Sequence, residues 1–346
     1  MQICCKRKDR NRYDTTSHFF PNNSMPSNAR IYVGIDAGGS KTELVAAKMQ
    51  EEELLNLFGP CGNPARVGFK DSADVITDLI VQAVERLQGE SIASVCAGVA
   101  GAGRPKDQHL LHEGIRSRLK DRIPTSARDV PVRVTHDSLI ALEAAFEGES
   151  GIMVISGTGT VSLARTNSGE FLRAGGWGYL IGDEGSGYAL GADGLRAVAH
   201  AFDGGPDTAL CDLLAASGDV TSKEDLFEVV YKKKTPLQRF ARIVIQGACD
   251  GDPVAERIVR KHIALLTEQV CWLADRCSAI RPRITLLGGL ANNPFYRKRL
   301  SSALLERLSG WECMQPLNRP VIGAWRMAND MTQGEGLAGS EQGTSA

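Results

Sequence analysis

The stretch from Ile31 to Ala47 brings together residues that could hold a phosphate group. An apolar run reaches Asp36, turns through a glycine pair and resumes as an alternating apolar stretch, which predicts a β-hairpin. Glycines let backbone N–H groups approach an anion, hydroxyls add donors, and a carboxylate can meet a hydrated magnesium ion. An ordinary Gly-Gly hairpin has the same pattern. The candidate phosphate-binding residues are Gly38, Gly39, Ser40, Lys41 and Thr42, with Asp36 as the candidate metal ligand.

The segment from Gly34 to Lys41 resembles a Walker A loop, but its register differs. Ser40 stands between Gly39 and Lys41, which breaks the Gly-Lys-Ser/Thr order. A strand is expected to follow the turn, so the pattern does not favour phosphate binding by a helix dipole.

A second glycine turn follows the same logic later in the chain. An apolar strand leads into a turn with hydroxyls, and another apolar strand follows it. Backbone N–H groups and hydroxyls together suit the β- and γ-phosphates of a nucleotide, although a simple hairpin turn is the alternative. Two such turns, each opening one half of the chain, indicate a duplicated architecture with a nucleotide clamped between two lobes. The second turn consists of Ser156, Gly157, Thr158, Gly159 and Thr160.

Asp137 lies between these turns, at a junction of a strand and a helix. The predicted strand covers 130–135 and the predicted helix covers 138–146. Open α/β folds display ligand-binding groups at such junctions, where Asp137 could act as a general base on a hydroxyl that attacks phosphorus. The alternative is a helix N-cap, which is common for aspartate. His136 is a less suitable base, because a lone histidine at a strand end is more often structural.

Two further glycine-rich segments are candidates for ligand contact. In the first, Gly175–Gly178 and Gly182–Gly187 place carboxylates near Trp177, an arrangement that suits a polar ligand with hydroxyl groups and is otherwise a solvated loop. In the second, Gly288 and Gly289 follow an apolar strand, where an adenosine could pack against the backbone or the chain could simply turn.

Strands and helices alternate around these motifs, which indicates an α/β fold. After the first hairpin we expect strands at 53–58, 91–99 and 130–135 and helices at 71–87, 107–119 and 138–146. After the second hairpin (151–165) we expect helices near 186–202, 207–216, 223–230, 236–249 and 252–278, a strand at 283–287, and helices from 294 and over 321–330. We therefore predict an N-terminal lobe (31–136, with 321–332 packing back on it), a C-terminal lobe (137–320), a disordered extension (1–30) and a disordered tail (333–346).

Composition excludes several classes of protein. The 346 residues carry a formal charge of −1, which gives no electrostatic footprint for nucleic acid or an anionic membrane. No apolar window approaches the length of a membrane span, and the N-terminal segment has no apolar signal region. The nine cysteines form no paired CxxC motif, so we expect reduced thiols in a cytoplasmic protein.

Taken in order, these motifs resemble the N-acetylglucosamine kinase and BadF/BadG/BcrA/BcrD-type ATPase family over about residues 31–330. The resemblance implies an α/β fold with two ribonuclease-H-like lobes, each a mixed sheet flanked by helices, and with ATP and Mg²⁺ in the interlobe cleft. Carried over to this sequence, Asp137 matches the catalytic aspartate, and Ser40, Thr158 and Thr160 match positions that face the ATP phosphates. Sugar contacts are implied for Asn63, Asp137, Gly176, Trp177, Gly178 and Asp183.

This sequence departs from the mammalian kinase pattern at two places. Pro64 and Ala65 follow Asn63 where that pattern has His-Trp, and Val161 follows Thr160 where it has asparagine. The expected activity is phosphorylation of N-acetylglucosamine at its 6-hydroxyl, with glucosamine or N-acetylmuramic acid as alternative substrates. A BadF-type ATPase that activates a radical dehydratase and a non-enzymatic sugar sensor are the rival functions. The expected partner is a small-molecule amino sugar, without nucleic acid or membrane, and a homodimer is allowed.

Overall fold

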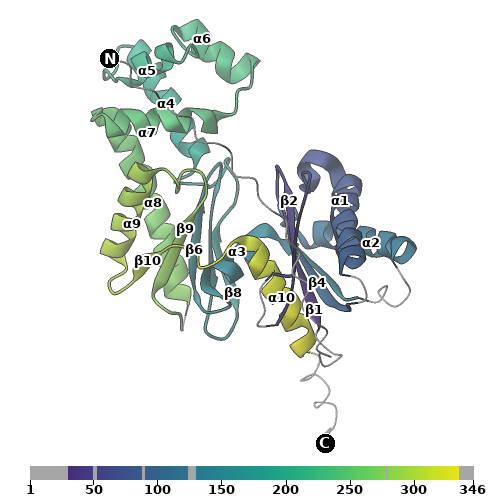
Figure 1. The fold of residues 1–346 in the computed structure, drawn as a ribbon. Coiled ribbons are helices and arrows are strands. Elements are labelled where there is room, and N and C mark those ends of the chain that lie inside the picture. The colour runs from purple at the N-terminus through teal and green to yellow at the C-terminus, as the bar shows by residue number, and fades with distance from the viewer. Residues whose placement is uncertain (1–29, 50–52, 88–89, 124–129, 278, 335–346) are drawn as a thin grey trace, which may run out of the picture.

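The computed structural model describes residues 30–49, 53–87, 90–123, 130–277 and 279–334 (Figure 1). The predicted extension lies outside the described residues except for residue 30. Most of the predicted tail also lies outside them, but residues 333 and 334 still belong to the last helix, α10 (Pro320–Gly334). No helix in the described part of the chain is both long and apolar enough to cross a membrane.

The first sheet has the strand order β3-β2-β1-β4-β5. Its central strand β1 is a continuous apolar run that pairs antiparallel with β2 and parallel with β4, and it is buried on both faces. Helices α1 (Pro64–Arg86) and α2 (Pro105–Arg122) cover one face of this sheet, and α10 packs on the other (Figure 1). The strands are β1 (Ile31–Ala37), β2 (Thr42–Lys48), β3 (Leu55–Gly59), β4 (Ile92–Val99) and β5 (Val132–His136).

The second sheet repeats this topology with the order β10-β9-β6-β7-β8. Strand β6 takes the place of β1, because it pairs antiparallel with β7 and parallel with β9. Helices α8 (Pro253–Arg276) and α9 (Pro294–Arg307) pack on one face. The predicted α/β fold of two mixed sheets flanked by helices is therefore confirmed. The strands are β6 (Gly151–Ser156), β7 (Thr160–Arg165), β8 (Phe171–Gly175), β9 (Arg283–Leu287) and β10 (Glu312–Met314).

Helices α3 (Asp137–Phe146) and α10 lie between the two sheets (Figure 1). Ile140 of α3 belongs to the apolar cluster of α10 and the first sheet, whereas Leu142 and Phe146 pack on the second sheet. The two helices approach closely at Gly323, where an added Cβ would lie 1.9 Å from the carbonyl oxygen of Ile140. Contacts of α10 with β1 and β4 place the C-terminal helix against the first sheet.

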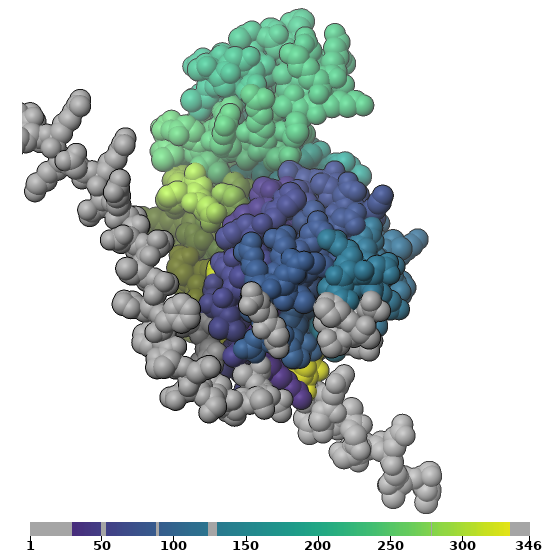
Figure 2. Space-filling model, turned by 45° about the vertical axis from the view of Figure 1, so that its right-hand side comes forward, coloured from purple at the N-terminus to yellow at the C-terminus, as the bar shows by residue number. Residues whose placement is uncertain are grey.

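A helical segment inserted between β8 and β9 projects from the rest of the molecule (Figure 2). It contains α4 (Gly187–Phe202), α5 (Leu210–Ala216), α6 (Lys223–Phe227), the π-helical turn η2 (Glu228–Lys232), the 3-10 turn η3 (Leu237–Phe240) and α7 (Ala241–Cys249). Where single helices were predicted at 223–230 and 236–249, the structure thus has two successive elements each, α6 with η2 and η3 with α7.

Other predicted boundaries also need correction. Helix α1 begins at Pro64 instead of residue 71, because Asn63 caps it and its chain bends at Gly68, which has a φ of 86°. Strands β8 and β10 were not predicted, since β8 mixes apolar residues with Arg173 and glycine, and β10 is a three-residue edge strand.

Candidate active site

A cavity of about 700 Å³ lies between the two halves of the molecule. The first half contributes Gly101 to Asp107 and the start of α3, and the second contributes the β6–β7 turn and the segment after β8. Parallel strands β1, β4 and β5 end on this side, which is where open α/β sheets present ligand-binding groups. The cavity brings together eight residues that the sequence analysis singled out: Asp137, Gly157, Thr158, Gly159, Thr160, Gly176, Gly178 and Asp183.

A second cavity, of about 320 Å³, lies beside the first. Gly289 lines it on one side, and Gln238 and Arg242 from the η3–α7 segment line it on the other. Gly157 and Thr158 line both cavities. The β6–β7 turn therefore stands between two ligand-sized spaces, and one elongated ligand could occupy both across this turn.

The β6–β7 turn is held tightly by the chain around it. Its ends are joined by a hydrogen bond from Gly157 N to Gly159 O (3.0 Å), and Gly187 N donates to Gly157 O (2.7 Å). An added Cβ on Gly159 would lie 2.7 Å from Oδ2 of Asp183, so a side chain there would displace the Asp183 carboxylate. The Thr160 hydroxyl is buried and donates to the carbonyl of Glu184 (3.0 Å), whereas Thr158 is exposed. Of the two threonines, Thr158 is the one whose hydroxyl is available to a ligand.

Asp137 is exposed toward the larger cavity at the first turn of α3. The N-cap position belongs to His136, and among the described residues Asp137 Oδ1 accepts only the neighbouring Ser138 N–H (2.9 Å). The carboxylate thus keeps acceptor capacity for a ligand. His136 is engaged elsewhere, because its Nδ1 contacts the Ser138 hydroxyl, and burial lowers the pKa of the imidazole. The geometry favours Asp137 over His136 as a general base.

Asp36 has an electrostatic environment that suits a cation. Burial, followed by the negative charges of Asp137 and Glu43, raises the pKa of Asp36 to about 6. Its carboxylate has no hydrogen-bond partner within the described residues. A half-buried carboxylate facing like charges is a fitting oxygen ligand for Mg²⁺, which would neutralise the repulsion.

The β1–β2 turn, by contrast, lines neither cavity. Gly38 N bonds Lys41 O (2.9 Å), and the Arg66 guanidinium donates to Gly39 O (2.7 Å). The Lys41 ammonium lies 3.7 Å from Glu43 and 4.7 Å from the centre of the Phe58 ring. Thr42 is fully buried and donates its hydroxyl to Pro60 O (2.8 Å). The Gly38 N–H, the Lys41 ammonium and the Thr42 hydroxyl, which were expected to hold phosphate, therefore contact groups of their own lobe.

Two predicted sugar contacts are also placed differently from the rest. Asn63 caps α1, accepting the Ala65 N–H (2.8 Å), and lies beside Gly101 at the edge of the larger cavity. Trp177 is 73% exposed and is not among the lining residues, because the glycines on either side line the cavity instead. The expected aromatic wall is absent from the lining of this cavity.

Sequence reasoning missed several polar residues that line the cavities. Arg104, Asp107 and Arg173 line the larger one, and Gln238 and Arg242 line the smaller. None of them belongs to a glycine motif. The one available signal was Arg104-Pro105, since proline at the first helical position predicts that a helix begins there.

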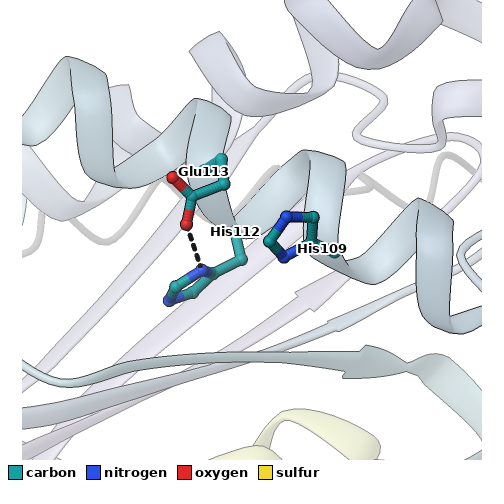
Figure 3. A group of neighbouring side chains, drawn as sticks. All are labelled: His109, His112 and Glu113. Carbon is teal, nitrogen blue, oxygen red and sulfur yellow. Dashed lines mark hydrogen bonds and ion pairs between the residues drawn. The ribbon is translucent and has the colours of Figure 1, made fainter.

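A group of metal-binding side chains lies outside the cavities, on α2 (Figure 3). The potential ligand atoms of His109, His112 and Glu113 lie within 4.8 Å of one another, and His112 Nδ1 is 3.1 Å from Glu113 Oε1. Two imidazoles favour transition metals over Mg²⁺. The group does not include Asp36, and no further side chain within the described residues orients it, so we assign it no part in the site.

Comparisons with known proteins agree with this geometry. The model of the BadF/BadG/BcrA/BcrD ATPase family matches residues 33–328. The N-acetylmuramic acid/N-acetylglucosamine kinase of Clostridium acetobutylicum is 32% identical over 276 residues, which cover 77% of this chain and 87% of that protein. The N-acetyl-D-glucosamine kinase of Dictyostelium discoideum is 33% identical over 317 residues, which cover 86% of this chain and 97% of that protein.

Solved structures share the fold. A candidate N-acetylglucosamine kinase from Chromobacterium violaceum has a TM-score of 0.62 at 22% identity, covering 87% of this chain and 99% of that one. The ROK hexokinase of Thermus thermophilus has a TM-score of 0.56 at 18% identity, covering 88% of this chain and 99% of that one. With a family model that spans nearly all the described residues and two relatives at about one-third identity, this chain belongs to the BadF/BadG/BcrA/BcrD ATPase family.

Proposed function

We propose that this protein transfers the terminal phosphoryl group of ATP to an amino sugar, with the 6-hydroxyl of N-acetylglucosamine as the first candidate acceptor. The observation that carries the proposal is the pair of adjoining cavities that share Gly157 and Thr158. Adenosine occupies the smaller cavity beside Gly289 and Arg242. The phosphates cross the β6–β7 turn, and the sugar occupies the larger cavity.

Asp137 is the residue placed to accept the proton of the attacking hydroxyl. It lines the larger cavity and not the smaller, and within the described residues the one hydrogen bond of its carboxylate is that from the Ser138 N–H to Oδ1. Phosphoryl transfer depends mainly on positioning and charge stabilisation, so a correctly placed base and phosphate cradle account for most of the required chemistry. Backbone N–H groups and the Thr158 hydroxyl hold the phosphates. Gly176, Gly178 and Asp183 contact the sugar, and Asn63, whose amide N–H₂ has no hydrogen-bond partner within the described residues, lies beside Gly101 at the edge of this cavity.

Mg²⁺, when bound beside Asp36, supplies positive charge that offsets the negative charge of the ATP phosphates. The raised pKa of Asp36 supports this assignment, because a nearby cation favours the charged carboxylate. The chain's own contribution is to hold that carboxylate at the end of β1, near Asp137.

Two amino sugars have specific support as substrates. Both curated relatives are named as kinases of N-acetylglucosamine, and one of them also as a kinase of N-acetylmuramic acid. Arg104 lines the sugar cavity, and its guanidinium has no hydrogen-bond or ion-pair partner within the described residues. An unpaired guanidinium suits the carboxylate of N-acetylmuramic acid. N-acetylmuramic acid is therefore the second candidate.

The rival functions have less support. Activators of radical dehydratases bind an iron–sulfur cluster through cysteines, and within the described residues no cysteine belongs to a group of three or more side chains that could share a metal ion. A non-enzymatic sensor would not need a base and a phosphate cradle on either side of one cavity.

The test is ATP consumption measured with N-acetylglucosamine, glucosamine, N-acetylmuramic acid and glucose in parallel. We expect turnover with the N-acetylated sugars and little with glucose. Comparing Arg104→Ala with wild type separates the two candidates, because loss of the guanidinium should weaken use of N-acetylmuramic acid more than use of N-acetylglucosamine. Sugar binding without ATP turnover would instead favour a sensor, and sugar-independent ATP turnover would favour the dehydratase-activating branch.

A further inference from the structure

The segment from Gly182 to Ser186, called the acidic loop below, has a conformation that its own sequence does not favour. Asp183 is 8% exposed and has a φ of 64°, a backbone region that non-glycine residues rarely adopt. Strain of this kind persists only where the surroundings hold it in place. The groups that hold the acidic loop therefore decide where the Asp183 carboxylate lies in the sugar cavity.

Three buried side chains converge on the backbone of one residue of this loop, Gly185. The hydroxyls of Tyr296 and Ser156 donate to the carbonyl oxygen of Gly185, at 2.8 Å and 2.7 Å. The N–H of Gly185 points to Nδ1 of His262 at 3.5 Å. Tyr296 is on α9 and His262 is on α8, so two helices that lie outside the cavity hold the loop by hydrogen bonds. Neither residue lines either cavity.

The protonation states of these groups follow from their partners. Burial raises the pKa of Tyr296 to about 12, so its hydroxyl stays a donor at neutral pH. His262 Nε2 lies 2.9 Å from Oδ2 of Asp193, which is also paired with Lys261 (2.8 Å) and Arg196. The pKa of Asp193 is held well below its usual range, mostly by the hydrogen bond with His262 and less by those with Lys261 and Arg196. In the tautomer whose Nε2–H donates to Asp193, Nδ1 is the acceptor that faces the Gly185 N–H.

We propose that Tyr296 and His262, with Asp193 orienting the imidazole, are positioning residues that fix the acidic loop so that Asp183 can bind the sugar. This inference rests on the proposed function for the role of Asp183. The loop also supplies the carbonyl of Glu184 to Thr160 and the N-cap Ser186 to α4, so its position is coupled to the β6–β7 turn. The chain thus sets its sugar site from residues that no ligand touches.

Tyr296→Phe is the first test, because it removes one hydroxyl and leaves in place the ring volume and the hydrogen bond from the Ser156 hydroxyl to Gly185 O. Without sugar, we expect faster hydrogen–deuterium exchange in peptides covering 182–187 and no change in peptides of β1. In the sugar-kinase assay, we expect the KM for N-acetylglucosamine to rise roughly three- to tenfold, while kcat and the KM for ATP change less than about twofold. Tyr231→Phe, at a 66% exposed tyrosine that lines neither the larger nor the smaller of the two cavities, is the matched control.

Two substitutions at His262 separate positioning from packing. His262→Phe removes the acceptor, whereas the amide oxygen of His262→Asn can still accept the Gly185 N–H. We expect the asparagine variant to have a sugar KM at least about threefold closer to wild type than the phenylalanine variant. Unchanged loop exchange in Tyr296→Phe, or equal rises in the KM values for sugar and ATP, would overturn the inference. If wild type phosphorylates no amino sugar, the proposed function fails, and the exchange measurements still decide whether these residues hold the loop.

Discussion

The two glycine turns occupy equivalent places in two sheets of the same topology, yet they differ in what they contact. In the β1–β2 turn, the Gly39 carbonyl accepts a hydrogen bond from Arg66 and the buried Thr42 hydroxyl donates one to the Pro60 carbonyl, both within the same lobe. The β6–β7 turn instead exposes Thr158 beside two cavities. Duplicated strand order therefore does not duplicate chemistry. What differs is the chain packed against each turn, since only the second has the acidic loop behind it.

The charges near the two turns also differ. Asp36 stands two residues before Gly38 in the first, whereas the apolar Ile155 stands two residues before Gly157 in the second. A carboxylate attracts a cation, and a turn of N–H groups and hydroxyls attracts an anion. Asp36, just before the first turn, is thus suited to a metal ion that accompanies a phosphate group, and the second turn is suited to the phosphate itself. Asp137 lies at the start of the helix between the two sheets.

The largest effect is expected from Asp137→Asn, which keeps the side-chain shape but removes the base. Turnover should fall by roughly 10²-fold or more, because general-base catalysis contributes about that much, while ATP affinity should stay near wild type. Steady-state kinetics with the best sugar, together with ATP binding by calorimetry, measures both. Turnover near wild type would remove Asp137 from its assigned role. A matching loss of ATP affinity would indicate a binding role instead.

The next largest effect separates the turns by steric room. An added Cβ at Gly159 would lie 2.7 Å from the Asp183 carboxylate, whereas at Gly39 it would meet only Arg66 at 3.6 Å, an ordinary contact. Gly159→Ala should therefore lower kcat/KM by about tenfold or more, as expected for a cost of at least about 1.4 kcal/mol. Gly39→Ala should change it by less than about twofold. Equal losses in the two variants would mean that the turns are functionally equivalent.

Much of this comparison could be predicted from the sequence, and its limits have physical causes. The hairpins were predictable because apolar strands flank glycines, and Asp137 was predictable because a strand runs directly into a helix. The role of Thr42 was not, since the pattern does not reveal that Pro60, 18 residues away, accepts its hydroxyl. The sugar contact expected of Trp177 stays a prediction, since this side chain is exposed and the glycines beside it line the cavity. Arg104 and Arg242 come from segments that only the tertiary fold brings to the cavities.

Hydroxyl removal gives a smaller and more specific contrast between the turns. Thr158→Val should raise the KM for ATP a few-fold with little loss of stability, because this side chain is exposed beside both cavities. Thr42→Val should have the opposite pattern. It leaves the Pro60 carbonyl without its donor, which costs about 1–3 kcal/mol of unfolding free energy, while ATP use by the folded protein changes little. Denaturant unfolding and ATP titration of both variants decide the assignment. Similar KM shifts in both would contradict the contrast.

The smallest effect concerns the stability of the protein without Mg²⁺ and depends on Asp36. The pKa of Asp36 is raised from 3.8 to about 6 in the folded protein, so the folded state binds this proton more tightly than the unfolded chain does. Stability linked to this proton is complete below about pH 4 and is lost as pH rises through about 6. Asp36→Asn removes this pH dependence of stability and should raise the melting temperature by a few degrees at about pH 7. At that pH the charged Asp36 lowers the free energy of unfolding by about 1–3 kcal/mol, before solvent screening reduces this cost. Thermal unfolding from about pH 4 to 7 in chelator measures this. Added Mg²⁺ should stabilise wild type more than the variant, and equal stabilisation of both would place the cation elsewhere.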